Sequence, residues 1–130
     1  MKSNRGFTVV ELLIVVAVLA AASVIFFIQK SNIETAARDD ARRTSINAIY
    51  YSLEEVYAKA NKAYPRIVSS ENLPSVDPSL FTDPNGVKIG EGESDFRYEP
   101  TNCNGDTCTN YTLRTSLEQE DDYIKTNRTE

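Results

Sequence analysis

The stretch from Phe7 to Ile28, FTVVELLIVVAVLAAASVIFFI, decides the fold of this 130-residue chain. Its 22 residues include one charged side chain, Glu11, and contain neither proline nor glycine. As a helix this stretch rises about 33 Å at ~1.5 Å per residue, which is enough to cross a lipid bilayer. It therefore predicts one membrane-spanning helix that carries a carboxylate near its start.

The carboxylate of Glu11 needs an explanation. An ionised acid at the centre of a membrane helix costs at least ~2.5–3.5 kcal/mol, so it is rarely found there without a partner. In the alternative interpretation, Glu11 lies at headgroup depth and contacts water, because it is only about 6 Å along the helix from Phe7. The position of Glu11 leaves both interpretations open, and the flanking sequence favours the first.

The six residues before the apolar run, MKSNRG, are hydrophilic and carry Lys2 and Arg5. Short basic flanks stay in the cytoplasm, which predicts a cytoplasmic N-terminus. An ordinary secretory signal has a shorter apolar stretch with a small-residue cleavage site after it, and no such site follows this run. The natural boundary falls before the run, at Gly6–Phe7, where the missing side chain of Gly6 lets a protease approach the backbone.

The string RGFTVVELLIVVAVLA resembles the N-terminus of type IV pilins and pseudopilins. That family combines a short basic leader ending in glycine, a phenylalanine, a glutamate as fifth residue of the mature chain and a continuous apolar helix. Gly6, Phe7 and Glu11 each match this pattern. The resemblance covers about the first 28 residues, and its motif is specific because several independent features must coincide.

The resemblance implies cleavage after Gly6 by a membrane prepilin peptidase and N-methylation of the new Phe7 amine. It implies that Glu11 then pairs with the Phe7 amine of a neighbouring subunit during assembly at an inner-membrane platform. Two poorly solvated opposite charges each remove the other's unpaired-charge penalty, so such a pair can act as a register device. The implied product is a homo-oligomeric helical filament. Its subunit begins as a single-pass prepilin in the cytoplasmic membrane and ends in an extracellular fimbrium.

Residues 29–63 are polar but keep a helical period, with apolar or small side chains every three or four positions. This spacing predicts an amphipathic helix whose stripe faces a core. The stripe consists of Ile33, Ala37, Ala41, Ile46, Ile49, Leu53, Val56, Tyr57, Ala60 and Tyr64. The charged residues on the other faces are interpreted as solvated: Glu34, Arg38, Asp39, Arg42, Arg43, Glu54, Glu55, Lys59 and Lys62. Pro65 disfavours helical geometry in the preceding residue, so the helix is predicted to end at Tyr64.

The remaining residues predict loops followed by a small sheet. Residues 66–92 are loop-like, with a turn at Asp83-Pro84-Asn85-Gly86. Strands are predicted at residues 96–98, 111–117 and 121–125, with a core of Phe81, Val87, Ile89, Phe96, Tyr98, Leu113 and Leu117. The fold class is therefore α+β, with the long helix packed on an antiparallel sheet of three or four strands. The predicted parts are a leader (1–6), a transmembrane assembly helix (7–28), an amphipathic helix (29–64) and a globular head (65–130).

Two cysteines, Cys103 and Cys108, flank a short Asn104-Gly105 loop. With no histidine and no other cysteine in the chain, they lack the ligands of a metal site. Outside the membrane they predict one disulfide closing this loop. The chain has a net charge of −5, and residues 65–130 hold six basic and thirteen acidic groups. This acidic balance argues against nucleic acid as a partner.

No catalytic constellation is present, since there is no histidine base and no serine in a nucleophile setting. We therefore expect no enzyme activity and no cofactor. Some secretion pseudopilins bind calcium in a distal loop, but the acids here do not match a twelve-residue calcium loop. The favoured function is a type IV pilus subunit for adhesion or twitching motility. The alternatives are a pseudopilin of a type II secretion system or of a competence system for DNA uptake.

Overall fold

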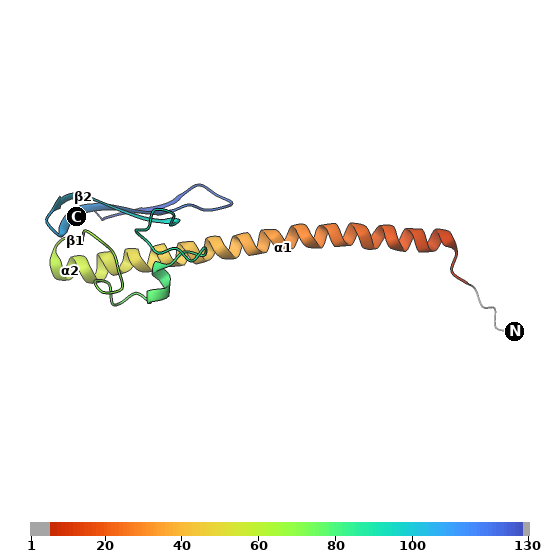
Figure 1. Cartoon of the computed structure of the whole chain (residues 1–130), viewed down its shortest axis with the longest axis horizontal. Helices are drawn as coiled ribbons and strands as arrows, with labels where there is room; N and C mark the ends of the chain where they lie inside the picture. Colours follow the sequence, from red (N-terminus) through yellow and green to blue (C-terminus); the bar gives the residue numbers. More distant parts are fainter. Residues whose placement is uncertain (1–5, 129–130) are drawn as a thin grey trace. The chain divides into compact units, whose positions relative to one another are not determined.

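The computed structural model describes residues 6–128 of the chain. The leader residues 1–5, including the basic Lys2 and Arg5, and the last two residues lie outside this range. The chain divides into two compact units, Met1–Thr35 and Ala36–Glu130, and each is described by itself. Helix α1 (Val9–Ser52) starts in the first unit and ends in the second, as Figure 1 shows.

The first unit is the apolar start of α1, and its large hydrophobic side chains are exposed. Among the described residues, one helix, spanning Val9–Asn61, is long and apolar enough to cross a membrane, and its most apolar window is entirely unburied. Between Leu12 and Ile28 the one polar side chain is that of Ser23, whose hydroxyl donates to the Leu19 carbonyl oxygen at 2.8 Å. The Ser23 hydroxyl, like the backbone amides of an α-helix, therefore finds its hydrogen-bond partner within the helix, as a lipid environment requires.

In the second unit, α1 is followed by one turn of π-helix, η1 (Leu53–Tyr57), and by α2 (Ala58–Asn61). The prediction that the helix ends at Tyr64 is wrong by three residues. Lys62 adopts the left-handed conformation with φ 55°, and its N–H closes the last turn on the Ala58 carbonyl at 2.8 Å. This frees Tyr64 and Pro65 to form the short strand β1 (Tyr64–Pro65).

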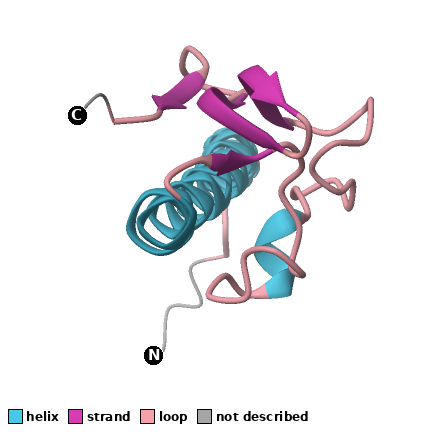
Figure 2. Cartoon of the chain, turned by 90° about the vertical axis from the view of Figure 1, so that its left-hand side faces the viewer, coloured by secondary structure: helices cyan, strands magenta, loops and turns pink. Residues whose placement is uncertain are grey.

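The sheet contains four antiparallel strands, which confirms the α+β fold class. Strands β2 (Phe96–Asn104) and β3 (Thr107–Thr115) form a hairpin joined by the two-residue turn at Gly105 and Asp106. The other edge of β3 pairs with β1 near its start and with β4 (Tyr123–Thr126) near its end. Viewed along the helix, the strands lie on one side of it (Figure 2).

Strand β2 departs from the sequence prediction, whereas the predicted turn before it is confirmed. Strand β2 continues through Pro100 to Asn104 instead of ending at residue 98. Because β2 pairs only with β3, it is an edge strand, and an edge strand accommodates a proline whose missing N–H would face away from the ladder. The predicted turn at Asp83–Gly86 is confirmed, with the Gly86 N–H donating to the Asp83 carbonyl at 2.9 Å.

The core lies between the helix, the sheet and the loop that links them. Its buried side chains are Ile46, Ile49, Leu53, Tyr64, Val68, Leu73, Val76, Phe81, Phe96, Tyr111 and Leu113. Of the predicted sheet core, Phe81, Phe96 and Leu113 are buried. The others are half-buried: Val87, Ile89, Tyr98 and Leu117. Loop residues Val68, Leu73 and Val76 enter the core from a region that the sequence assigned only to turns.

The predicted helix stripe is wrong at both ends. Ile33 is 68% exposed, and Ala37 and Ala41 are also exposed. Val56 and Ala60, near the other end, face solvent as well. Three charged residues are buried instead, although the sequence predicted them to be solvated: Asp39, Arg42 and Glu54.

Candidate functional site

The start of α1 carries the first candidate site, formed by Thr8 and Glu11. The backbone N–H and the hydroxyl of Thr8 both donate to Glu11 Oε2, each at 2.9 Å. In return the Glu11 N–H donates to Thr8 Oγ1 at 3.2 Å. This reciprocal arrangement is a capping box, which satisfies amide groups that a helix start otherwise leaves without partners. The Thr-x-x-Glu spacing in the sequence signals it, although the sequence analysis did not use that signal.

The capping box leaves the charge of Glu11 uncancelled. Its partners are a neutral amide and a neutral hydroxyl, both on the same Oε2 atom. Hydrogen bonds from neutral donors stabilise a carboxylate but supply no opposite charge, so an ammonium group placed here would still be attracted strongly. Within one described chain, Glu11 is therefore held in place and remains able to take a cationic partner.

Gly6 and Phe7 precede the helix in exposed chain without regular secondary structure. Phe7 is 79% exposed. A Cβ built on Gly6 would meet no atom within 4 Å, and Gly6 does not adopt a positive φ. Neither packing nor backbone conformation within the described chain therefore demands glycine here. A requirement for glycine at this position would have to come from outside the chain.

In the head, a buried ionic cluster joins the helix to two loops. Arg42, only 4% exposed, donates to Asp39 at 2.9 Å, to Glu118 at 2.8 Å and to Asp95 at 2.9 Å. Asp39 also accepts from the backbone N–H groups of Glu118 and Gln119, at 3.0–3.2 Å. Positions 39, 42, 46 and 49 share one helix face, so this cluster continues the core stripe with charged side chains.

Two carboxylates of this cluster, those of Glu118 and Asp39, have lowered pKa values and are held in their ionised form. The guanidinium groups of Arg38 and Arg42, which donate to Glu118, lower its pKa to about 2. Burial by itself would raise the pKa of Asp39, but the amides of Glu118 and Gln119 and the nearby Arg42 lower it below its usual range. The cluster therefore fixes the segment after β3 to the helix through charges that persist at neutral pH.

A second buried acid, Glu54, lies in the π-helical turn and is 7% exposed. The Tyr111 hydroxyl donates to Glu54 Oε1 at 2.7 Å, and the Tyr64 hydroxyl donates to Oε2 at 3.2 Å. The rings of Tyr64 and Tyr111 meet edge to face, with centroids 4.7 Å apart. Burial and the adjacent Glu54 carboxylate raise the pKa of Tyr111 well above its ordinary value.

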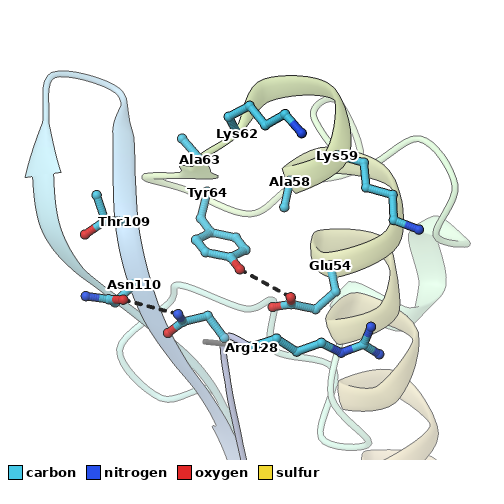
Figure 3. A pocket seen from close by; sticks show the side chains of 10 residues that line it. Glu54, Ala58, Lys59, Lys62, Ala63, Tyr64, Thr109, Asn110 and Arg128 are labelled. Carbon is cyan, nitrogen blue, oxygen red and sulfur yellow. Dashed lines mark hydrogen bonds between the residues drawn. The ribbon is translucent and has the colours of Figure 1, made fainter. Parts of the chain in front are cut away.

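Glu54 also borders a cavity of about 510 Å³ at the end of the helix, shown in Figure 3. Its walls come from η1 and α2, from the start of β1, from β3 and from the two residues that follow β4. Asn110 and Asn127 both line it and contact each other, with Asn127 Nδ2 donating to Asn110 Oδ1 at 3.1 Å. Lys59, Lys62 and Arg128 lie around its rim.

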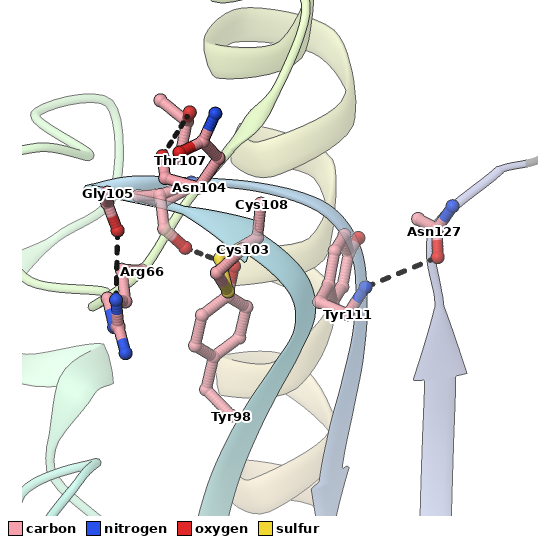
Figure 4. Close-up of a disulfide and its surroundings, with 10 residues drawn as sticks. Arg66, Tyr98, Cys103, Asn104, Gly105, Thr107, Cys108, Tyr111 and Asn127 are labelled. Atoms are coloured by element: carbon pink, nitrogen blue, oxygen red, sulfur yellow. Dashed lines mark hydrogen bonds between the residues drawn. A yellow bond between two sulfur atoms is a disulfide. The ribbon is translucent and has the colours of Figure 1, made fainter.

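The two cysteines are joined by a disulfide that connects directly opposed residues of the β2–β3 hairpin (Figure 4). Arg66 holds the tip of the same hairpin. Its side chain donates to the Gly105 carbonyl and its backbone N–H donates to the Asp106 carbonyl, both at 3.0 Å. Gly105 has φ 64°, which glycine adopts without strain and which a two-residue hairpin turn requires at its first position.

Comparison with known families gives one match. Residues 1–27 match the family described as the prokaryotic N-terminal methylation motif. Neither the curated proteins nor the solved structures contain a match to this chain. The matched motif implies processing by a prepilin peptidase and points to a structural protein of membrane-associated pilus machinery. Together with the exposed apolar helix, it fits a chain anchored in the membrane before assembly. Residues 1–27 therefore carry the class III signal peptide of type IV pilins and pseudopilins.

Proposed function

We propose that this chain is a structural subunit of a type IV pilus filament that serves adhesion or twitching motility. The observation that carries the proposal is the methylation motif over residues 1–27, with its glutamate at the start of an exposed apolar helix. A helix whose apolar side chains are uncovered needs lipid or other helices around it. Identical subunits that pack these helices together would form a homo-oligomeric filament.

The first step of the proposed pathway is cleavage between Gly6 and Phe7, followed by N-methylation of Phe7. Both residues lie in exposed, non-helical chain, which suits entry into a protease site. The described chain has no internal need for glycine at position 6. A protease that must approach the backbone closely would supply that need.

The second step is the pairing of Glu11 with the Phe7 amine of a neighbouring subunit. In the single chain, Thr8 holds the Glu11 carboxylate through neutral donors at 2.9 Å. An ammonium group adds the opposite charge that these donors lack, and the attraction is strong where water is scarce. The capping box would thus hold the carboxylate in a defined orientation until docking provides its partner.

We propose that the subunit begins in the cytoplasmic membrane as a single-pass prepilin and ends in an extracellular fimbrium. Its partners are the prepilin peptidase, the inner-membrane assembly platform and further copies of the chain. The alternative is a pseudopilin of a type II secretion system or of a competence system. The Tyr64-Pro65 pair and the turn at Asp83–Gly86 resemble the major secretion pseudopilin. The thirteen acidic groups among residues 65–130 argue against DNA uptake.

Glu11→Leu tests the proposal directly. The variant should be produced, cleaved and inserted in the membrane, but it should be absent or scarce in sheared filaments. Glu34→Leu is the matched control, since Glu34 lies on the same helix and makes only an exposed ion pair with Lys30 at 3.8 Å. A normal filament yield from Glu11→Leu would overturn the proposed pairing. Mass spectrometry of the wild-type filaments, identifying this chain as their dominant protein, would separate the pilus from the pseudopilin alternatives.

A further inference from the structure

Unusual backbone conformations border the cavity beside Glu54. The helix widens to a π-helical turn at Leu53–Tyr57, which contains Glu54 and precedes the other helical residues that line the cavity. Such turns are rare and frequently occur at functional sites. On the rim, Lys62 holds a left-handed conformation with φ 55°, which is uncommon for a residue with a side chain. Two unfavourable backbone conformations beside the same cavity suggest a functional site, so we asked what the cavity could bind.

The wall of the cavity offers acceptors for hydroxyl groups. A carboxylate has about four acceptor positions, and the tyrosine hydroxyls at 2.7 and 3.2 Å occupy two of those of Glu54. The remaining positions belong to a 93%-buried side chain that borders the cavity, because Glu54 is 7% exposed. Asn110 and Asn127 add amide donors that their mutual hydrogen bond does not exhaust.

The rim offers one cation with no internal partner. Lys59 and Arg128 each form an ion pair with Glu55. The side chain of Lys62 makes no ion pair or hydrogen bond with any of residues 6–128, and Lys62 is exposed. Counting Glu54, Glu55, Lys59, Lys62 and Arg128, the groups in and around the cavity carry a net charge of +1.

The arrangement of these charges restricts the ligand. Glu54 and Lys62 are eight residues apart, so their Cα atoms are separated by about 12 Å of rise along the helix and its C-cap. A compact anion such as phosphate would be repelled by the Glu54 carboxylate and would gain nothing from its acceptors. A molecule with hydroxyl groups at one end and a carboxylate at the other satisfies both. A cavity of about 510 Å³ lies within the usual size range of small-molecule sites.

We propose that this cavity binds an acidic disaccharide unit, with sugar hydroxyls on Glu54 and Asn110 and the sugar carboxylate on Lys62. The site would give the head a glycan-binding surface that is separate from the N-terminal assembly segment. It does not depend on whether the chain builds a pilus or a pseudopilus. Its residues lie in the second unit, so substitutions there leave Gly6, Phe7 and Glu11 unchanged.

The test uses the full chain in detergent micelles, with cellobiouronic acid as the acidic probe and cellobiose as its neutral match. Titration calorimetry should give a millimolar dissociation constant for cellobiouronic acid and clearly weaker binding of cellobiose. Amide NMR shifts should move at Ala58, Ala63 and Thr109, which line the cavity. No binding, equal binding of both sugars, or shifts confined to other residues would overturn the proposal.

Lys62→Asn removes the charge while asparagine keeps access to the left-handed conformation. It should weaken cellobiouronic acid binding roughly tenfold, the effect of losing one charge-assisted hydrogen bond, and leave cellobiose binding unchanged. Lys62→Arg should retain binding. Lys88→Asn is the matched control, because Lys88 is an exposed lysine of the same head that does not line the cavity. An equal effect of both asparagine variants would overturn the proposed role of Lys62.

Glu54→Gln probes the other end of the site and should weaken the binding of both sugars. Its circular dichroism and melting temperature separate a binding defect from a folding defect, and the exposed Lys62→Asn variant remains decisive if this variant unfolds. Binding of polyphosphate or of a DNA oligonucleotide in place of the acidic sugar would contradict the proposal. Filament yield, measured on the same variants, should equal that of wild type, so a failure of this proposal is distinguishable from a failure of the assembly proposal.

Discussion

Replacing Arg42 with methionine tests whether the buried ionic cluster holds the head together. Methionine fills much of the arginine volume but removes the guanidinium hydrogen bonds to Asp39, Asp95 and Glu118. Removing one partner of a buried ion pair typically costs about 3–5 kcal/mol, because the other charge stays buried without compensation. Asp39 keeps its amide donors from Glu118 and Gln119, so we expect the lower end, about 3 kcal/mol.

A loss of that size is a large part of the 5–15 kcal/mol by which domains are usually stable. For a domain of up to about 100 residues, 1 kcal/mol shifts Tm by about 4–8 °C, so Arg42→Met should lower Tm by at least about 12 °C. The assay is thermal unfolding of the full chain in micelles, followed by tyrosine circular dichroism. Arg114→Met is the control, since Arg114 pairs with Glu99 at 2.9 Å where the two side chains are 36% and 49% exposed, far more than that of Arg42. Arg114→Met should lower the free energy of unfolding by less than about 1 kcal/mol. Equal Tm losses for the two variants would refute the assigned role of the cluster.

Two further predictions concern acid and redox conditions. The pKa of Glu118 is about 2 in the folded chain, against an ordinary value of 4.5. Its ion pairs therefore stabilise the head fully above pH 4.5, and this stabilisation is lost as the pH falls toward 2. Tm measured from pH 6 to pH 2 should therefore fall within that window, and Glu118→Gln should flatten the fall, whereas identical profiles would contradict the assignment. Replacing both Cys103 and Cys108 with serine should cost about 2 kcal/mol, because a loop this short restrains the unfolded chain only modestly. A reducing agent should lower the Tm of the wild type equally and leave that variant unchanged.

The parts of the fold that follow from periodicity were predictable. The uncharged run after Glu11 specified the membrane-type helix, and the alternation around Tyr111 and Leu113 specified a strand with one buried face. The Asp83–Gly86 turn followed from its proline, asparagine and glycine. Each of these signals acts over a few neighbouring residues, so it can be read from a local stretch of sequence.

The charged part of the core was not predictable from the same signals. A periodic pattern treats apolar residues as core and charged residues as surface, so it placed Ala37 and Ala41 inside and Asp39 and Arg42 outside. The structure reverses this, because the acids and amides that satisfy Arg42 and Asp39 come from residues 95 and 118–119, far along the chain. Long-range partners of this kind leave no mark in a local window.

The helix end was missed for a local reason. Pro65 excludes helical geometry from Tyr64 but does not require the helix to reach it. Lys62 ends the helix earlier by adopting a left-handed conformation that lysine rarely takes, and no residue type near it signals that choice. The cavity beside Glu54 depends on this early end, since α2 and β1 meet around it.

The central claim, that this chain is processed at Gly6–Phe7 and assembles as a mature subunit, is tested most directly by N-terminal mass analysis of sheared filaments. We predict that the protein recovered from them begins at Phe7 and carries one methyl group on the Phe7 amine. Recovery of a chain that still begins at Met1, or of an unmethylated Phe7, would contradict it.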